Sequence, residues 1–148
     1  MLLRNALLKH KWNLSVAESL TAGLVADLIV QTEGSSKYFK GGIVAYQNEA
    51  KRKLLGVEFT LLLSKGAVDS EVAFEMAKGA IYSFDSDCAI STTGFADGDQ
   101  AGLVYICALT PTKRVVREFR LCDDAMLSRQ EVRKVAAEQA LKLLLTLL

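Results

Sequence analysis

Three side chains could together support hydrolytic chemistry: Ser19, Tyr46 and Lys51. Ser19 follows a predicted strand at residues 13–17, and the backbone N–H groups of a helix that begins there could stabilise an oxyanion beside its hydroxyl. A serine nucleophile needs a base, and the chain contains one histidine, His10. A lysine in a partly dry cleft can lose its proton near neutral pH and serve instead. Because Tyr46 ends a predicted strand and Lys51 lies one turn into the next helix, both could face one cleft with Ser19.

Each of these residues also has an interpretation without chemistry. Serine is a favoured N-cap residue, so Ser19 could simply begin a helix. Lys51 stands beside Arg52 and Lys53, which is typical of a solvated helix face. Tyr46 could pack at the end of its strand. Position alone favours these structural roles.

Two further segments could hold an anionic group. Thr93 and Gly94 begin a loop that could cradle an oxyanion, although residues 97–99 (Asp-Gly-Asp) are typical of a turn and would repel a phosphate. Arg129 and Arg133 are four residues apart on a predicted helix. They share one face, where they could contact an anion or form a surface pair.

Alternating strands and helices must position these residues. The hydrophobic periodicity predicts helices at 2–11, 20–30, 48–55, 71–84 and 129–148, and strands at 13–17, 41–46, 88–93, 103–110 and 114–120. The last two strands form a predicted hairpin. This order predicts one α/β domain over residues 1–148 with a mixed sheet.

Composition excludes several classes of function. The 148 residues are 51% hydrophobic and 24% charged, which is typical of a globular domain. A net charge of +1 gives no electrostatic argument for nucleic acid or an anionic membrane as partner. No apolar run reaches the roughly 18 residues of a membrane span, and the start of the chain does not resemble a signal peptide. One histidine and three widely spaced cysteines argue against a metal site or a disulfide framework. We expect a cytoplasmic protein without a metal or cofactor.

Five segments in this order resemble one known family. They are VAESLTAGLVADLI (16–29), EGSSKYFKGGIVAYQNEAKRKLLGV (33–57), SKGAVDSEVAFEMAKGA (64–80), CAISTTGFA (88–96) and SRQEVRKVAAEQALKLL (128–144). The chain resembles the CinA C-terminal domain family, which includes bacterial nicotinamide-mononucleotide amidohydrolases. The most specific matches are A-E-S-x-T at 17–21 and G-G-I-V-A-Y-x-N-E-A-K at 41–51.

The resemblance implies a three-layer α/β/α fold and a reaction in pyridine-nucleotide salvage. The expected substrate is nicotinamide mononucleotide, whose carboxamide is hydrolysed to nicotinate mononucleotide and ammonia without a metal or cofactor. By resemblance, Ser19 is the nucleophile and Lys51 the base, acting directly or through Tyr46. Backbone N–H groups near Thr21 and Gly94 would hold the oxyanion. The expected substrate-binding residues are Thr21, Gly23, Asn48, Thr93, Gly94, Arg129 and Arg133.

The chain departs from the family pattern beside this site. Leu20 and Ala22 stand where the family usually has Cys and Gly, and Gln47 stands where it usually has Ser. The loop Phe95–Ala101 is shorter than the family's Gly- and Pro-rich loop and carries two aspartates. These differences keep two alternatives open: a catalytically silent homologue acting as a binding or assembly module, and an amidase for another small amide.

The apolar run Leu141–Leu148 is longer than one helix face normally buries. An exposed apolar surface of this kind is typical of a subunit contact. We therefore predict a homo-oligomer.

Overall fold

The fold is built around a five-stranded mixed sheet in a computed structural model that describes residues 2–148. The strand order is β2-β1-β3-β4-β5. Strand β1 (Leu14–Glu18) runs parallel to both β2 (Phe39–Val44) and β3 (Cys88–Gly94). The hairpin β4 (Leu103–Leu109) and β5 (Arg114–Arg120) continues the sheet in antiparallel pairing. The carboxyl ends of the three parallel strands therefore meet at one edge, where ligands bind in many α/β proteins.

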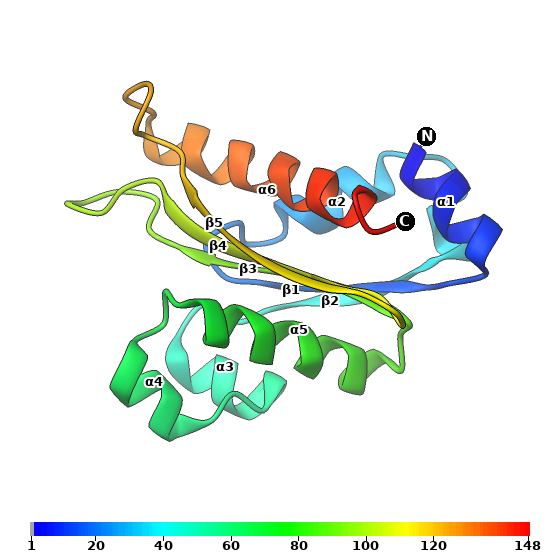
Figure 1. Cartoon of the computed structure of the whole chain (residues 1–148), viewed down its shortest axis with the longest axis horizontal. Coiled ribbons are helices and arrows are strands. Elements are labelled where there is room, and N and C mark those ends of the chain that lie inside the picture. Colours follow the sequence, from blue (N-terminus) through cyan, green and yellow to red (C-terminus); the bar gives the residue numbers. More distant parts are fainter. Residues whose placement is uncertain (1) are drawn as a thin grey trace.

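Helices cover both faces of this sheet (Figure 1). Helices α1 (Leu2–His10), α2 (Leu24–Val30) and α6 (Arg129–Leu145) lie on one face. Helices α3 (Asn48–Leu55), α4 (Phe59–Lys65) and α5 (Ser70–Phe84) lie on the other, and a short 3₁₀ helix spans Ser35–Lys37. The predicted three-layer α/β/α architecture is confirmed.

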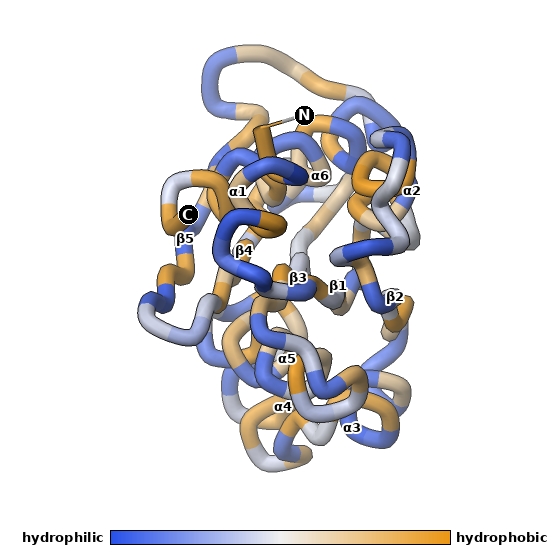
Figure 2. The backbone as a smooth tube through the Cα atoms, turned by 90° about the vertical axis from the view of Figure 1, so that its right-hand side faces the viewer, coloured by the Kyte–Doolittle hydropathy of each residue, from blue (hydrophilic) through white to orange (hydrophobic). Residues whose placement is uncertain are grey.

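Central strand β1 is buried along its whole length because both of its faces are covered. Side chains alternate between the faces of a strand, so Leu14 and Val16 join the core beneath α2 and α6, whereas Ala17 joins the core beneath α3 and α5. Figure 2, turned by 90°, shows the two helix layers on opposite sides of the strands. Two apolar cores thus hold the sheet between the helix layers.

The predicted helix at 20–30 begins four residues later than expected. Helix α2 starts at Leu24 with Gly23 in the N-cap position at φ +99°, so Ser19 is not a helix cap. Residues 19–23 instead form a turn in which Ala22 has a φ of +46°. Buried Leu20 extended the apolar pattern into this turn, which explains the wrong boundary.

A short helix was also missed, and the apolar run at the chain's C-terminal end is partly buried within the chain. Helix α4 is only seven residues long, too short to produce a clear periodicity between Gly56 and Gly66. In the apolar run at the chain's C-terminal end, Leu143 and Leu144 are buried within the same chain, where α6 packs on the sheet and on α1. Leu141, Leu145, Leu147 and Leu148 of the same run are only partly buried. The homo-oligomer stays a prediction. No helix within residues 2–148 is long and apolar enough to cross a bilayer.

Candidate active site

The side chain of Lys51 is buried at the carboxyl edge of the sheet. It is 1% exposed although it is charged in water, and it lies on the face of α3 that also buries Leu55. Its Nζ lies 2.9 Å from Ser19 Oγ, 3.1 Å from the Ala45 carbonyl oxygen and 3.0 Å from the Tyr46 carbonyl oxygen. The solvated-face interpretation of Lys51 is therefore wrong.

Burial decides the protonation of this amine. The three neighbours are a hydroxyl and two carbonyls, and no carboxylate pairs with Lys51 among residues 2–148. Desolvation disfavours the ammonium form and lowers the pKa of Lys51 from 10.5 to about 8. The neutral amine can donate to the two carbonyls and accept the Ser19 proton with its lone pair. This is the arrangement of a nucleophile with its base.

Ser19 is fixed by the two strands that flank β1. Its N–H donates to the Thr92 carbonyl of β3 over 3.0 Å, and the Ala45 N–H after β2 donates to the Glu18 carbonyl over 2.8 Å. These bonds continue the parallel pairing past the ends of the strands. Ser19 and the two carbonyls that hold Lys51 therefore lie at the same edge.

Sequence reasoning missed Glu18, which organises the turn behind Ser19. Its buried carboxylate accepts hydrogen bonds from the Thr21 hydroxyl (2.6 Å), the Val25 N–H (2.9 Å) and the Ala26 N–H (3.1 Å). Glu18 thus satisfies the first turn of α2 in place of the N-cap side chain that Gly23 lacks. The sequence signal was a single carboxylate at the end of an otherwise uncharged strand.

Arg133 supports the same turn from the other side. Its guanidinium donates to the carbonyls of Leu20 (2.8 Å) and Thr21 (3.4 Å). The N–H groups of Leu20 and Thr21 donate no hydrogen bond to another group within residues 2–148. The turn that follows Ser19 therefore has two backbone donors without a partner among the described residues, and an oxyanion hole needs such donors.

Helix α3, which carries Lys51, is held against α5 by close backbone contact. A Cβ added at Gly79 would overlap the Leu55 carbonyl. The two helices can approach this closely only because position 79 has no side chain. Gly79 therefore sets the depth at which Lys51 enters the site.

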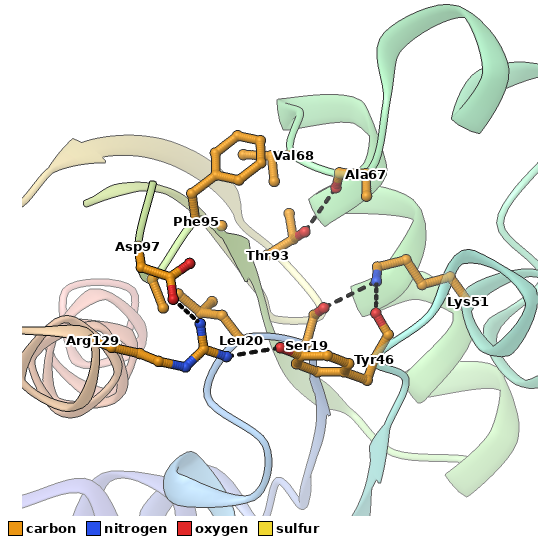
Figure 3. A pocket seen from close by; sticks show the side chains of 12 residues that line it. Ser19, Leu20, Tyr46, Lys51, Ala67, Val68, Thr93, Phe95, Asp97 and Arg129 are labelled. Carbon is orange, nitrogen blue, oxygen red and sulfur yellow. Dashed lines mark hydrogen bonds and ion pairs between the residues drawn. The ribbon is translucent and has the colours of Figure 1, made fainter. Parts of the chain in front are cut away.

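Ser19 and Lys51 line a cavity of about 250 Å³ (Figure 3). The lining residues are Ser19, Leu20, Tyr46, Lys51, Ala67, Val68, Thr93, Gly94, Phe95, Ala96, Asp97 and Arg129. Most of the wall is apolar. The Thr93 hydroxyl donates to the Ala67 carbonyl over 2.7 Å, which ties the loop before α5 to the end of β3.

Three polar side chains that contact one another line one side of this cavity. Arg129 Nη1 lies 2.7 Å from Asp97 Oδ2, and Arg129 Nη2 donates to the Tyr46 hydroxyl over 3.0 Å (Figure 3). Ser128 begins α6 in a reciprocal capping box with Glu131, which fixes Arg129 as the first residue of the helix. The Tyr46 side chain is 56% exposed, so its expected packing role is wrong.

The contact between Lys51 and Ser19 is direct. The Tyr46 hydroxyl contacts Arg129, and the contribution of Tyr46 to the Lys51 amine is its backbone carbonyl. A proton route through the Tyr46 hydroxyl, expected as one of two possibilities, has no hydrogen bond to Ser19 or Lys51 to support it.

The predicted site residues fall into two groups. Ser19, Tyr46, Lys51, Thr93, Gly94 and Arg129 line the cavity, whereas Thr21, Gly23, Asn48 and Arg133 lie outside its lining. The Thr21 hydroxyl is occupied by Glu18 and Thr92, and Asn48 is exposed at the start of α3. Gly23 and Arg133 shape the turn, as described above.

Comparison with known proteins gives a consistent family match. The model of the CinA C-terminal domain matches residues 2–148. A CinA-like protein of Geobacter sulfurreducens is 41% identical over 134 residues, covering 86% of this chain and 32% of that protein. A CinA-like protein of Kosmotoga olearia is 42% identical over 143 residues, covering 93% of this chain and 34% of that protein. The chain thus spans about a third of the length of these curated relatives.

Solved structures agree with this match. The competence/damage inducible protein CihA from Agrobacterium tumefaciens superposes with a TM-score of 0.91 at 33% identity, covering 99% of this chain and 93% of that one. A CinA superfamily protein from Escherichia coli also has a TM-score of 0.91, at 30% identity, covering 99% of this chain and 86% of that one.

Proposed function

Because the chain belongs to the CinA C-terminal domain family, we propose that it is an amidohydrolase in which Ser19 attacks a carboxamide and Lys51 is the general base. The observation that carries this proposal is the 2.9 Å contact between a buried, unpaired lysine amine and a serine hydroxyl. A lysine held away from water and without a carboxylate has no evident structural purpose. Burying such a group costs stability, and sites with this property are often functional.

The reaction proceeds through an acyl-enzyme. The neutral Lys51 amine takes the Ser19 proton while Oγ forms a bond to the amide carbon. The ammonium then returns this proton to the leaving nitrogen as the C–N bond breaks, and ammonia departs. Water attacks the ester carbon with Lys51 again as base, which releases the acid and restores the Ser19 hydroxyl.

Two groups of contacts assist these steps. The carbonyls of Ala45 and Tyr46 hold the Lys51 amine in place and stabilise its ammonium form once the proton has arrived. The unused N–H groups of Leu20 and Thr21 would donate to the oxyanion. Arg133 keeps these donors in position through the carbonyls of the same two residues.

The proposed reaction converts nicotinamide mononucleotide to nicotinate mononucleotide and ammonia, in keeping with the family resemblance. The apolar wall formed by Leu20, Val68 and Phe95 suits a flat aromatic carboxamide. An amidase for another small amide is the second candidate. Asp97 favours this candidate because its carboxylate lies on Arg129 at the side of the cavity.

The test is ammonia release from nicotinamide mononucleotide and from amides without a phosphate, with Ser19→Ala as the matched variant. The proposal predicts turnover of at least one amide by the wild-type protein and none by the variant. Turnover that survives Ser19→Ala would remove Ser19 from the mechanism. Absence of turnover on every amide would favour the catalytically silent module.

A further inference from the structure

Few charged side chains line the candidate active site. Among the residues that line the cavity, three carry charged side chains: Lys51, Asp97 and Arg129. Lys51 is buried and occupied by Ser19 and two carbonyls. Arg129 is therefore the one lining residue that could pair with an anionic group of a ligand.

The guanidinium of Arg129 already has two partners. Nη1 lies 2.7 Å from the Asp97 carboxylate, and Nη2 donates to the Tyr46 hydroxyl over 3.0 Å. An incoming phosphate would have to displace the Asp97 carboxylate from Arg129, and this carboxylate also repels the phosphate. The pair has no net charge, so this side of the cavity attracts an anion less than an unpaired arginine would.

The backbone of the loop fixes Asp97 in this position. The Phe95 N–H donates to the Leu103 carbonyl over 2.9 Å, and the Gly102 N–H donates back to the Phe95 carbonyl over 2.8 Å. Gly98, at φ +82°, makes the turn directly after Asp97. The loop is thus closed at its base, and Asp97 extends from it toward the start of α6 (Figure 3).

We propose that Asp97 is a specificity-determining residue that makes the site select carboxamides without a phosphate over phosphorylated ones. This inference rests on the second candidate of the proposed amidohydrolase function, an amidase for another small amide. It also extends that function, because it assigns the substrate class to one side chain. A like charge placed against an undesired ligand is a common means of discrimination.

The experiment compares nicotinamide mononucleotide with the same molecule lacking its phosphate, nicotinamide riboside. Both kcat/KM for ammonia release and Kd by calorimetry are measured for the wild-type protein, Asp97→Asn and Asp99→Asn. Asp99 is the matched control, because it lies in the same loop, is exposed, and does not line the cavity. Both variants remove one negative charge.

We expect the wild-type protein to prefer the riboside by about tenfold or more. Asp97→Asn should move the ratio toward the phosphorylated compound by about tenfold, chiefly through KM, and Asp99→Asn should leave it within about twofold. Equal ratios in all three proteins, or an equal effect of Asp99→Asn, would overturn the proposal.

The two measurements separate this inference from the proposed function. If neither compound is turned over but the ratio of Kd values shifts in Asp97→Asn alone, the amidohydrolase assignment fails and the selection by Asp97 stands. If neither compound binds, the selection by Asp97 is overturned as well. Turnover with an unchanged ratio overturns only the role of Asp97.

Discussion

The Lys51 amine and the Ser19 hydroxyl lie 2.9 Å apart in a site that almost completely excludes water from the amine. Two backbone carbonyls, from Ala45 and Tyr46, orient the amine toward the serine. The position of both groups follows from the parallel pairing of β1 with β2 and β3, which brings the ends of three strands together. The proposed mechanism therefore needs no imidazole to activate this hydroxyl.

The rate of hydrolysis should increase with pH in the range where Lys51 loses its proton. Burial lowers the pKa of Lys51 to about 8, and only the neutral amine can accept the Ser19 proton. We expect kcat/KM to rise about tenfold per pH unit below this value and to level off above it. The measurement is the pH–rate profile of ammonia release between pH 6 and about 10. A flat profile would contradict the role of Lys51 as base.

The stability of the protein should also depend on pH because Lys51 titrates, and its two pKa values fix the direction of this dependence. The pKa of Lys51 is 10.5 in ordinary surroundings and about 8 in the fold, so the unfolded chain binds this proton more tightly. Burial of Lys51 therefore lowers the free energy of unfolding by its full amount below about pH 8, and this destabilisation is lost as the pH rises to about 10.5. Its size is on the order of 3 kcal/mol, at ~1.4 kcal/mol per pH unit.

The control for this effect is Lys51→Met, whose unbranched side chain is one atom shorter than that of lysine and cannot titrate. Urea unfolding at several pH values from 7 to about 10 should show the wild-type protein gaining stability relative to this variant. Parallel pH dependence in the two proteins would mean that Lys51 keeps an ordinary pKa.

Replacing Glu18 with Gln should destabilise the fold and impair the site. Oε1 of the carboxylate accepts from the Thr21 hydroxyl and the Val25 N–H, and Oε2 accepts from the Ala26 N–H; the amide puts an N–H₂ group in place of one of these oxygens. We expect a loss of about 1–3 kcal/mol, because one buried donor is left without an acceptor. Denaturant unfolding measures this loss, and Glu33→Gln, at an exposed position, is the matched control. Equal stabilities would show that the carboxylate does not organise the turn.

Gly79→Ala should reverse the usual effect of this substitution. Alanine in a helix interior normally stabilises it by about 1 kcal/mol relative to glycine. Here the new Cβ would overlap the Leu55 carbonyl, so we expect a loss of about 1–3 kcal/mol and slower turnover as α3 moves Lys51 away from Ser19. Thermal unfolding and ammonia release check both effects. Tyr82→Ala, at a 91% exposed position of α5, should change neither. A stabilised Gly79→Ala protein would contradict the close contact.

Much of the fold was predictable because hydrophobic periodicity, and with it the succession of helices and strands along the chain, is a local property of the sequence. The start of the helix after Ser19 could not be predicted, because Leu20 is buried in a turn and therefore looks like the first residue of an amphipathic helix. The burial of Lys51 had one overlooked signal. Lys51 and Leu55 are four residues apart and share the buried face of α3, whereas the neighbouring Arg52 and Lys53 are exposed.

The contact between Asp97 and Arg129 could not be predicted from spacing. The two residues are 32 positions apart, one in a loop and one at the start of α6, and no periodicity relates them. The same holds for Arg133, whose hydrogen bonds to the Leu20 and Thr21 carbonyls join positions more than 100 residues apart. Side-chain contacts between distant elements depend on packing angles that a hydrophobic pattern does not encode.

The most direct test of the central claim is the labelling of Ser19 by a fluorophosphonate, which reacts with activated serine hydroxyls and requires no knowledge of the substrate. Intact-mass spectrometry and peptide mapping would follow the reaction in the wild-type protein and in Lys51→Met. A buried neutral amine beside the hydroxyl predicts modification at Ser19 that accelerates as the pH passes about 8 and falls by at least ~100-fold in the variant. An unmodified Ser19, or equal labelling in the two proteins, would contradict it.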